Sequence, residues 1–286
     1  MIITVTLNAA LDRSLTVPIL QLGQRHRASD VLTLAGGKGI NVARALKRLD
    51  HPVVATGLAG GRTGTRIVEQ LTEESILNDF VRIRQESRTS TLVVDPTSGK
   101  QTEINEWGPK VSETELEMLL DKIRYLARSA EVVVFAGSLP RGVADGFYGE
   151  AARELARRGV RVALDTEGEP LRRGLEAEPW LVSPNQHEAE QLVGQELFDD
   201  EDFLMALDTI AEMGARNVHI TLENGCFALL AQWLTAVLDG SPAEEALRLA
   251  AAAGAASVLE VGAGRFDPAE VRRLLPAVEV HELAHA

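Results

Sequence analysis

The sequence predicts an α/β protein with a doubly wound, mostly parallel sheet, helices on both faces of that sheet, and a small β-sheet lid. Short apolar, β-branched runs alternate along the chain with segments of helical periodicity, which is the pattern of repeated strand–helix–strand units. Two stretches with polar alternation interrupt this rhythm, and we expect them to form the lid. A length of 286 residues suits a single domain spanning residues 1–286.

The expected main-sheet strands are near-continuous apolar runs, as is typical of strands covered on both faces. They lie at residues 2–7, 53–58, 131–135, 160–165, 180–183 and 218–222. A further strand is expected at residues 227–231, directly before a helix at residues 233–238.

Helical signals lie between these strands. One apolar stripe with the spacing i, i+3, i+4, i+7 is formed by Val42, Ala45, Leu46 and Leu49. Ser112 followed by Glu115 predicts a capping box at a helix start. Ser241 followed by Pro242 repeats the start signal, with the proline expected at the first helical position.

The lid is expected from residues 14–34 and 82–104. Each stretch has the composition of a strand pair with no helix between its strands. Such a sheet would stand off the main domain and expose edges, so we expect a second copy of the chain to cover it in a homodimer.

The composition indicates which classes of partner the protein can bind and in which cellular compartment it works. A net charge of -13 and a pI near 5.0 argue against nucleic acid as a partner. The single cysteine, Cys226, excludes an intrachain disulfide and fits a reducing cytoplasm. Residues 1–7 have the pattern of a strand rather than a signal peptide, and the apolar stretch 249–259 is too short to span a bilayer. We therefore expect a cytoplasmic protein without a membrane partner.

A glycine-rich segment, AGGKGIN at residues 35–41, opens the helix that carries the first apolar stripe. Glycines allow close backbone approach to a ligand, and a helix N-terminus favours an anion. The spacing is neither that of a Walker loop nor that of the dinucleotide-binding GxGxxG motif. From the residues alone, a tight turn before a helix is the alternative interpretation.

Several segments resemble motifs of the ribokinase-type (PfkB) carbohydrate kinases. Residues 36–43 are similar to the GGKGxNxA sugar-site motif of that family. Residues 6–13, TLNAALDR, resemble the TLNPAxDR opening of its phosphofructokinase branch, with Ala9 in place of proline. Four further segments resemble family motifs: ETRTN at residues 86–90, GSLPPG at 137–142, PNxxE at 184–188 and GAGRF at 262–266. The resemblance covers nearly the whole chain and implies the ribokinase-like fold.

The resemblance implies a site for a sugar phosphate. Asp12 would accept hydrogen bonds from sugar hydroxyls, Arg88 would contact the substrate phosphate, and Arg27 matches a lid arginine of the family. The other implied substrate-binding residues are Gly36, Gly37, Lys38, Asn41 and Ser138. From the residues alone, Arg88 could equally be a solvated side chain on an edge strand.

The resemblance also implies ATP and Mg²⁺. Asn185 and Glu188 would bind the metal ion and position the nucleotide phosphates, because Mg²⁺ takes oxygen ligands. Thr221 and Gly225 lie where the family binds the nucleotide, although Glu223 replaces the usual first glycine there. Asn185 and Glu188 also have the spacing of a helix capping box, and both interpretations can hold at once.

One family motif is absent. The catalytic base of these kinases is the aspartate of a GxGD motif at a helix N-terminus, and the sequence contains no GxGD. Only Gln232 separates the strand and the helix expected around it, with no turn residue between them. We therefore expect the catalytic aspartate in a segment of about 20–35 residues, missing between Gln232 and Trp233. The segment is either deleted from the protein or omitted from the printed sequence.

The implied activity is ATP-dependent phosphorylation of a ketohexose phosphate. Fructose 1-phosphate, fructose 6-phosphate and tagatose 6-phosphate remain open as substrates. Because the base is absent, a non-catalytic sugar-phosphate-binding protein on the same fold is the alternative function.

Overall fold

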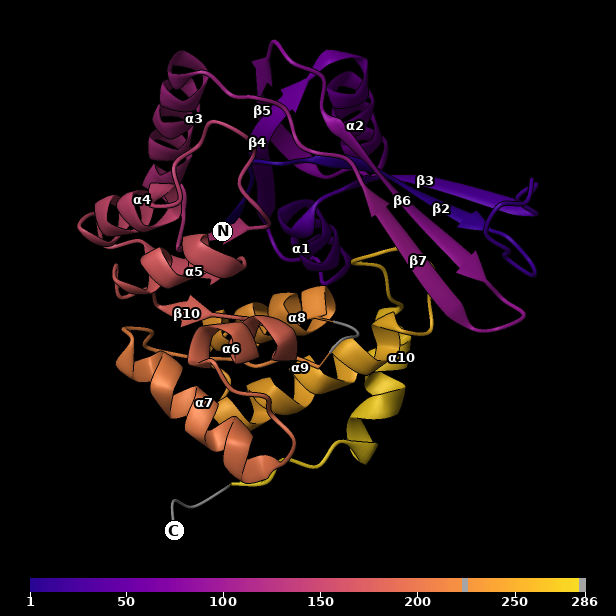
Figure 1. Cartoon of the computed structure of the whole chain (residues 1–286). Coiled ribbons are helices and arrows are strands. Elements are labelled where there is room, and N and C mark those ends of the chain that lie inside the picture. The colour runs from indigo at the N-terminus through magenta and orange to yellow at the C-terminus, as the bar shows by residue number, and fades with distance from the viewer. Residues whose placement is uncertain (223–225, 283–286) are drawn as a thin grey trace.

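The computed structural model describes residues 1–222 and 226–282 of the chain. Its main sheet has six strands, all paired in parallel, in the order β10-β9-β8-β1-β4-β5 (Figure 1). These strands are β1 (Ile2–Thr6), β4 (Val53–Gly60), β5 (Leu77–Ile83), β8 (Val132–Ala136), β9 (Arg161–Asp165) and β10 (Leu181–Val182). The predicted parallel sheet is confirmed.

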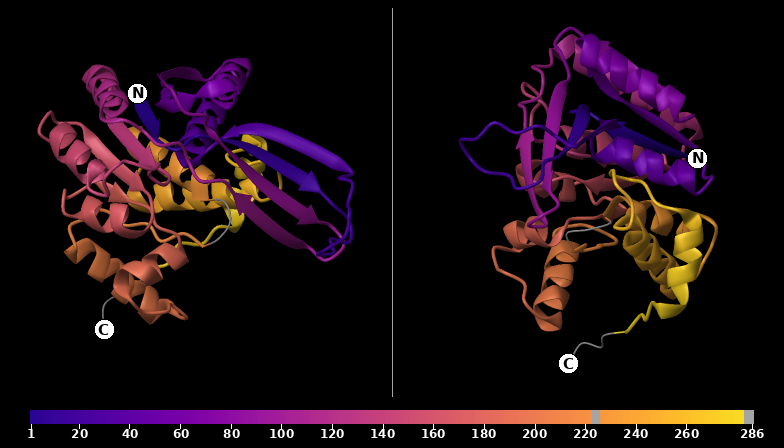
Figure 2. Two further views of the ribbon diagram at one scale, coloured as in Figure 1. Left: turned by 45° about the horizontal axis from the view of Figure 1, so that its top comes forward. Right: turned by 90° about the vertical axis from the view of Figure 1, so that its right-hand side faces the viewer.

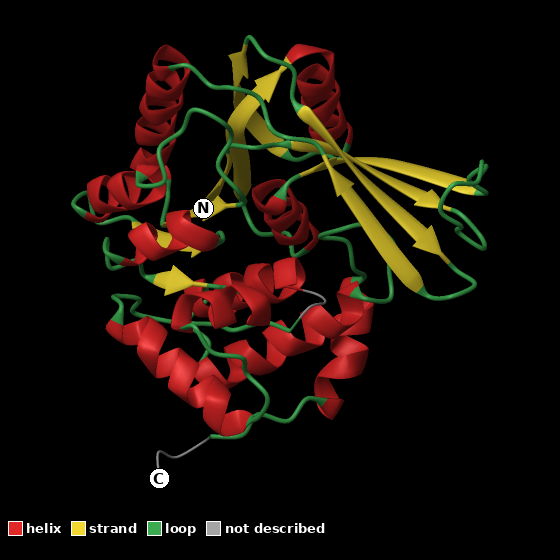
Figure 3. Ribbon diagram, in the orientation of Figure 1, coloured by secondary structure: helices red, strands yellow, loops and turns green. Residues whose placement is uncertain are grey.

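Helices cover both faces of this sheet (Figures 2 and 3). They are α1 (Lys38–Arg48), α2 (Gly61–Glu73), α3 (Glu113–Leu126), α4 (Phe147–Ala156), α5 (Gly168–Leu175), α6 (Gln186–Val193), α7 (Asp200–Glu212), α8 (Cys226–Leu238), α9 (Ala243–Ser257) and α10 (Pro268–Leu274). Short 3₁₀ turns follow α3 at Ala127–Ser129 and α10 at Leu275–Ala277. None of the helices in the described ranges is long and apolar enough to cross a membrane.

The two faces carry separate hydrophobic cores because successive side chains of a strand point to opposite faces. Ile2 of β1 packs with residues of α1, α2, α8 and α9, whereas Ile3 packs with residues of α3, α4, α5 and α7. Both isoleucines are fully buried. This two-sided burial is why the strands are apolar at nearly every position.

The lid is a four-stranded mixed sheet that projects from the main body (Figure 1). Its strands are β3 (Asp30–Gly36), β2 (Ala10–Thr16), β6 (Arg88–Asp95) and β7 (Lys100–Asn105), in that order. In its register Asp12 pairs with Leu34 on one side and with Ser90 on the other. The predicted lid is confirmed, but its strands begin at residues 10 and 88 rather than 14 and 82.

The prediction of a strand at residues 227–231 was wrong. These residues belong to α8, which runs without a break to Leu238. The helix packs against α1 and α9, and Ala228, Leu230, Ala231 and Leu234 are buried. A helix that is apolar on most sides has no clear periodic stripe, so a short stretch of it cannot be told from a buried strand.

Three smaller predictions also need correction. Residues 218–222 form only isolated bridges, from Val218 and Thr221 to the chain around β10, and no continuous strand. Pro242 is the N-cap of α9 rather than its first residue, and no side chain caps that helix. Sequence analysis missed α2, whose first turn is rich in glycine and threonine, both poor helix formers.

Candidate active site

Most of the residues proposed for the site gather at the carboxyl ends of the main-sheet strands, where the lid joins. Asn8 follows β1, and its Nδ2 donates to Oγ of Ser138, which follows β8, at 3.1 Å. Lys38 at the start of α1 reaches Asp165, the last residue of β9, with Nζ to Oδ1 at 2.9 Å. Carboxyl ends of parallel strands are the usual place for ligands in open α/β sheets.

The glycine-rich turn lies directly against Asp12. A Cβ atom at position 36 would stand 1.8 Å from Oδ2 of Asp12, so only glycine allows this approach. Gly37 has φ near 110°, and a Cβ atom there would stand 2.8 Å from Cγ2 of Thr6. Both glycines are therefore required by the geometry that places Asp12 beside the N-terminus of α1.

The carboxyl group of Asp12 has a raised pKa. Burial raises its pKa from 3.8 to about 6, although Arg88 and Arg44 pull in the opposite direction. The backbone N–H of Gly37 also favours the charged form, and Glu103 disfavours it. A half-buried carboxylate whose oxygens can accept further hydrogen bonds is suited to sugar hydroxyls.

Lys38 forms an ion-pair triad with two carboxylates. Its Nζ lies 2.9 Å from Asp165 Oδ1 and 2.8 Å from Glu188 Oε1, and both acids are about 95% buried. Burial alone would lower the pKa of Lys38, but the two carboxylates outweigh it and hold that pKa above its ordinary value. Lys38 is therefore a fixed positive charge at the start of α1, where an anion is also favoured.

Asp165 was missed by the sequence analysis. The available signal was its position as the last residue of a predicted strand, the same kind of signal that exists for the residues after β1 and β8. Its pairing with Lys38, 127 positions earlier, depends on the order of the strands in the sheet, which cannot be read from the sequence.

Asn185 and Glu188 form the capping box of α6. Asn185 Oδ1 accepts from the backbone N–H of Glu188 at 2.9 Å, and Glu188 Oε2 accepts from the N–H of Asn185 at 2.9 Å. The capping interpretation is confirmed, whereas the metal and nucleotide roles stay predictions. Burial raises the pKa of Glu188, an effect that the nearby Lys38 ammonium partly offsets.

The donor atoms here fit a magnesium ion that is also held by phosphates. Asp165 and Glu188 supply buried carboxylate oxygens at one place, both within 3 Å of the same cation, Lys38 Nζ. The described residues contain no group of three or more acidic, His or Cys side chains arranged for a metal ion. Magnesium commonly uses one or two carboxylates and takes its other ligands from phosphate and water, so two suffice.

We predict that Glu188→Gln raises the Mg²⁺ concentration needed for nucleotide binding but leaves the melting temperature nearly unchanged. A glutamine can still accept at this capping-box position, and Lys38 keeps Asp165 as its partner. Calorimetric titration of ATP at several Mg²⁺ concentrations measures the first effect, and thermal unfolding measures the second.

Asn185→Ala is the matched control, because it removes a cap and should cost about 0.5–2 kcal/mol of stability. If Glu188→Gln lowers stability just as much and leaves the Mg²⁺ dependence unchanged, Glu188 serves only the helix.

Arg88 reaches from the lid into the site. Its Nε donates to the backbone oxygen of Asn8 at 3.3 Å, and its Nη1 donates to Oδ1 of Asn105 at 3.2 Å. Arg27, by contrast, is exposed in the loop that joins β2 to β3 at the tip of the lid. The strand pair that holds Asp12 beside Leu34 ends at Thr16 and Asp30, so Arg27 is not brought to Asp12 of its own chain.

Of the other predicted site residues, the structure describes Asn41 and Thr221 but not Gly225. Asn41 on α1 is buried, and its Oδ1 accepts from Arg44 Nη1 at 2.8 Å. Thr221 is buried, its backbone oxygen accepts from Gln186, and its Oγ1 is unpaired within the described part of the chain. Gly225 and the side chain of Cys226 lie outside the described residues, so their predicted roles are not tested.

The expected position of the missing segment, between Gln232 and Trp233, stays a prediction, but the strand-to-helix connection on which it was based is not found. Gln232 and Trp233 are consecutive residues inside α8, so no strand-to-helix connection exists between them. The path from Thr221, which bridges to Asn185, to the first residue of α8 instead crosses residues 222–225. A segment ending in an aspartate at the N-terminus of α8 would have to enter there.

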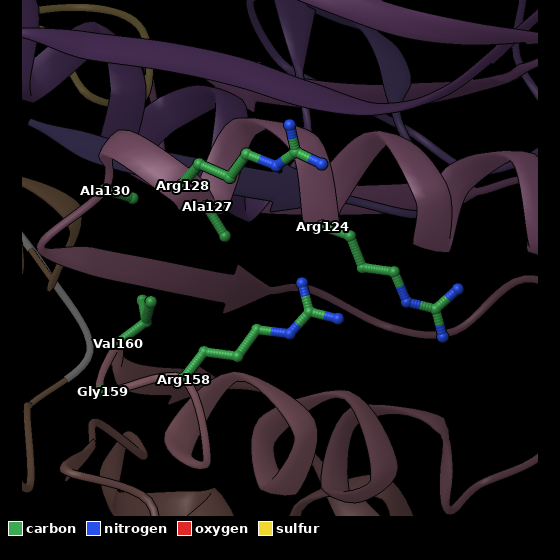
Figure 4. A pocket seen from close by; sticks show the side chains of 7 residues that line it. All are labelled: Arg124, Ala127, Arg128, Ala130, Arg158, Gly159 and Val160. Carbon is green, nitrogen blue, oxygen red and sulfur yellow. The ribbon is translucent and has the colours of Figure 1, made fainter.

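A hollow of about 330 Å³ lies away from these residues, between Ala127–Ser129 and the start of β9 (Figure 4). It is lined by Arg124, Ala127, Arg128, Ala130, Arg158, Gly159 and Val160. Arg124 is paired with Asp121 and Glu154, and Arg158 is paired with Glu154, which offsets their charge. The hollow is at the amino ends of the strands and is not part of the candidate active site.

Comparisons with known proteins agree with this geometry. Residues 5–232 match the profile described as pfkB family carbohydrate kinase. A Bacillus subtilis protein named 1-phosphofructokinase is 31% identical, with 99% of this chain and 100% of that protein covered. A Borreliella burgdorferi protein of the same name is 29% identical, with 99% of each chain covered. Phosphofructokinase-2 from Escherichia coli, solved with potassium, has a TM-score of 0.88, 24% identity and coverage of 96% and 98%.

The alignments with the two 1-phosphofructokinases also show that this chain lacks residues that its relatives contain within the aligned region. The alignment with the Borreliella protein is 310 positions long, against 286 residues here, so at least 24 positions have no counterpart in this chain. For the Bacillus protein the alignment is 311 positions long and the difference is 25. Because both alignments cover 99% of this chain, these positions lie within it rather than beyond its ends.

Proposed function

Because the chain belongs to the pfkB family of carbohydrate kinases, we propose that it phosphorylates a ketohexose phosphate with ATP, and that fructose 1-phosphate is its substrate. The observation that carries the proposal is the meeting of Asp12, the glycine turn and Arg88 at one end of the sheet. Asp12 supplies acceptors for hydroxyls, and Arg88 supplies a cation for phosphate. The name shared by the two curated relatives supports fructose 1-phosphate over the 6-phosphates.

On the sugar side, the chain binds and orients. The ionised Asp12 would accept from sugar hydroxyls, while the buried amide of Asn41 would donate to the sugar from α1. Gly36 and Gly37 keep the turn free of side chains, so the ligand can approach the N-terminus of α1. This orientation is the main contribution that a kinase makes, since phosphoryl transfer depends on positioning and charge neutralisation.

On the nucleotide side, Lys38 is the central cation. Its ammonium stands between Asp165 and Glu188 and would also attract the phosphates of ATP. Asp165 and Glu188 would hold a magnesium ion, which neutralises phosphate charge when it is bound. Asn185 fixes Glu188 through the reciprocal cap, so the carboxylate is already oriented before any ligand binds.

A second function, sugar-phosphate binding without efficient transfer, is favoured by one specific observation. The sequence contains no GxGD, and at least 24 positions of the relatives have no counterpart here. The binding residues Asp12, Lys38 and Asn41 are nevertheless present and packed into the site. A chain that has these binding residues but lacks the GxGD aspartate would bind the sugar phosphate and phosphorylate it only slowly.

One experiment separates the two functions. ADP release would be measured with fructose 1-phosphate, fructose 6-phosphate and tagatose 6-phosphate, and binding of each would be measured by calorimetry. Turnover supports the kinase, and binding without turnover supports the sensor. Absence of binding for all three sugars would refute both.

We predict that Arg88→Ala weakens the binding of fructose 1-phosphate far more than that of free fructose. Loss of a charge-assisted contact should cost about 1.5–3 kcal/mol, which is roughly ten- to a hundredfold in affinity. Calorimetry with both ligands measures the difference. Arg13→Ala is a matched control, because Arg13 is an exposed arginine of the adjacent lid strand. Equal losses for the two sugars in Arg88→Ala would show that Arg88 does not read the phosphate.

We also propose a homodimer formed through the lid sheet. The lid has two edge strands, β3 and β7, and carries the exposed apolar side chains Val31 and Ile104. Exposed edges invite pairing or cover by another chain. Sedimentation of the wild type and of Ile104→Lys tests this, and a monomeric wild type would refute it. The cytoplasmic location stays a prediction.

A further inference from the structure

Arg44 is a buried arginine whose whole guanidinium is engaged, in part by the glycine turn. It lies on α1 with 3% of its surface exposed. Nη2 donates to the backbone oxygen of Ala35 at 2.7 Å, and Nη1 donates to Asn41 Oδ1 at 2.8 Å and to the oxygen of Ala263 at 3.1 Å. One side chain thus joins the glycine turn, a predicted substrate residue and the C-terminal loop.

The charge of Arg44 is neutralised by a carboxylate from outside the glycine turn. Glu74, at the end of α2, accepts from Nε and from Nη2 of Arg44, the latter at 2.9 Å. A planar fork held by a carboxylate in this way has little rotational freedom. The donors that remain are therefore fixed in direction, and they point to Ala35, Asn41 and Ala263.

The contact with Asn41 decides which end of that amide faces a ligand. An arginine donates only, so the atom of Asn41 that it contacts must be the amide oxygen. With its oxygen engaged by Arg44, the NH₂ group is the end of the Asn41 amide that can donate to a ligand. The backbone of Asn41 is also confined, because a Cβ atom on Gly264 would stand 2.2 Å from its oxygen.

We propose that Arg44 is a positioning residue for the sugar-phosphate site. It acts through Asn41, by holding the amide with its NH₂ group toward the ligand, and through Ala35, by fixing the start of the glycine turn. The consequence for a bound sugar phosphate rests on the proposed function, whereas the orientation of the Asn41 amide does not. Arg44 itself touches neither the sugar nor the nucleotide.

The test is a double-mutant cycle on fructose 1-phosphate affinity. Arg44→Lys keeps a cation for Glu74 but loses the fork, and we expect affinity to fall about tenfold. In the Asn41→Ala background the same change should have much less effect, because residues that act together give non-additive losses. An equal loss in both backgrounds, or no loss in either, would overturn the proposal.

Arg48→Lys is the matched control. Arg48 lies one turn further along α1 and also ties the helix to the C-terminal segment, with Nη1 to the oxygen of Phe266 at 2.9 Å. No contact joins it to Asn41 among the described residues. We expect Arg48→Lys to leave affinity unchanged, and a tenfold loss there would mean that docking of the C-terminal segment, not Asn41, sets the affinity.

A second readout needs no ligand. The side-chain NH₂ resonance of Asn41, identified by its absence in Asn41→Ala, should shift in Arg44→Lys and not in Arg48→Lys. If the wild type binds no hexose phosphate, the proposed function fails and this resonance still decides the role of Arg44. An unchanged resonance in Arg44→Lys would overturn the orientation.

Discussion

Phosphoryl transfer by this chain is expected to be at least about a hundredfold slower than by the same chain with a GxGD segment restored, because a positioned base contributes about that much. The described site holds its carboxylates elsewhere: Asp12 stands against the glycine turn, and Asp165 and Glu188 are paired with Lys38. None of these lies at the N-terminus of α8, where such an aspartate would enter.

The restoration can be made directly. A segment that contains the family's GxGD motif would replace residues 223–225, so that its aspartate precedes Cys226, and ADP release would be compared at saturating substrate. The control is the same replacement with the GxGD aspartate changed to asparagine. A rescue by the aspartate form alone supports the argument. Fast turnover from the unmodified chain, with an intact mass of 30.9 kDa, would mean that another residue is the base.

Asp12→Ala is expected to weaken sugar-phosphate binding by roughly ten- to a hundredfold while leaving the binding of ATP unchanged. Hydrogen bonds to a charged group contribute about 1.5–3 kcal/mol, and Asp12 is the described carboxylate beside the glycine turn. Lys38, which would meet the nucleotide, is paired with other acids and keeps its charge. Calorimetry with each ligand measures both effects, and an unchanged sugar affinity would refute the role of Asp12.

Asp12→Asn adds a test through pH. Since the pKa of Asp12 is raised to about 6, wild-type affinity should increase as pH rises through 6, where the carboxyl ionises. The substrate phosphate also titrates near pH 6, but it does so equally in Asp12→Asn, so the difference between the two proteins isolates Asp12.

The same shift predicts a stability difference. A carboxyl whose folded pKa lies above its unfolded value of 3.8 binds more protons when folded, so its contribution is favourable below 3.8 and is lost as pH rises through 6. Asp12→Asn should therefore melt at a higher temperature than the wild type at pH 7, and the two should converge near pH 4. A lower melting temperature for Asp12→Asn at pH 7 would contradict the raised pKa.

The sequence alone determined the features that depend on neighbouring residues. The apolar run of β1 predicted a strand buried on both faces, since a strand that helices cover on both sides has apolar side chains at nearly every position. Ser112 and Glu115 predicted the capping box that the structure contains, since its bonds span only three residues. Gly36 and Gly37 predicted a close backbone approach to a ligand, which stays a prediction. The motif that contains them, together with the other motifs in their order along the chain, indicated the family.

Only the tertiary structure decided which distant groups meet. Lys38 reaches Asp165 and Glu188 because α1, β9 and α6 start or end at the same edge of the sheet, a consequence of strand order. It also decided that residues 227–231 are helical, because α8 packs against α1 and α9 and its apolar pattern has no clear period. Local pattern records which side chains are buried, whereas packing against the rest of the chain decides the backbone that buries them.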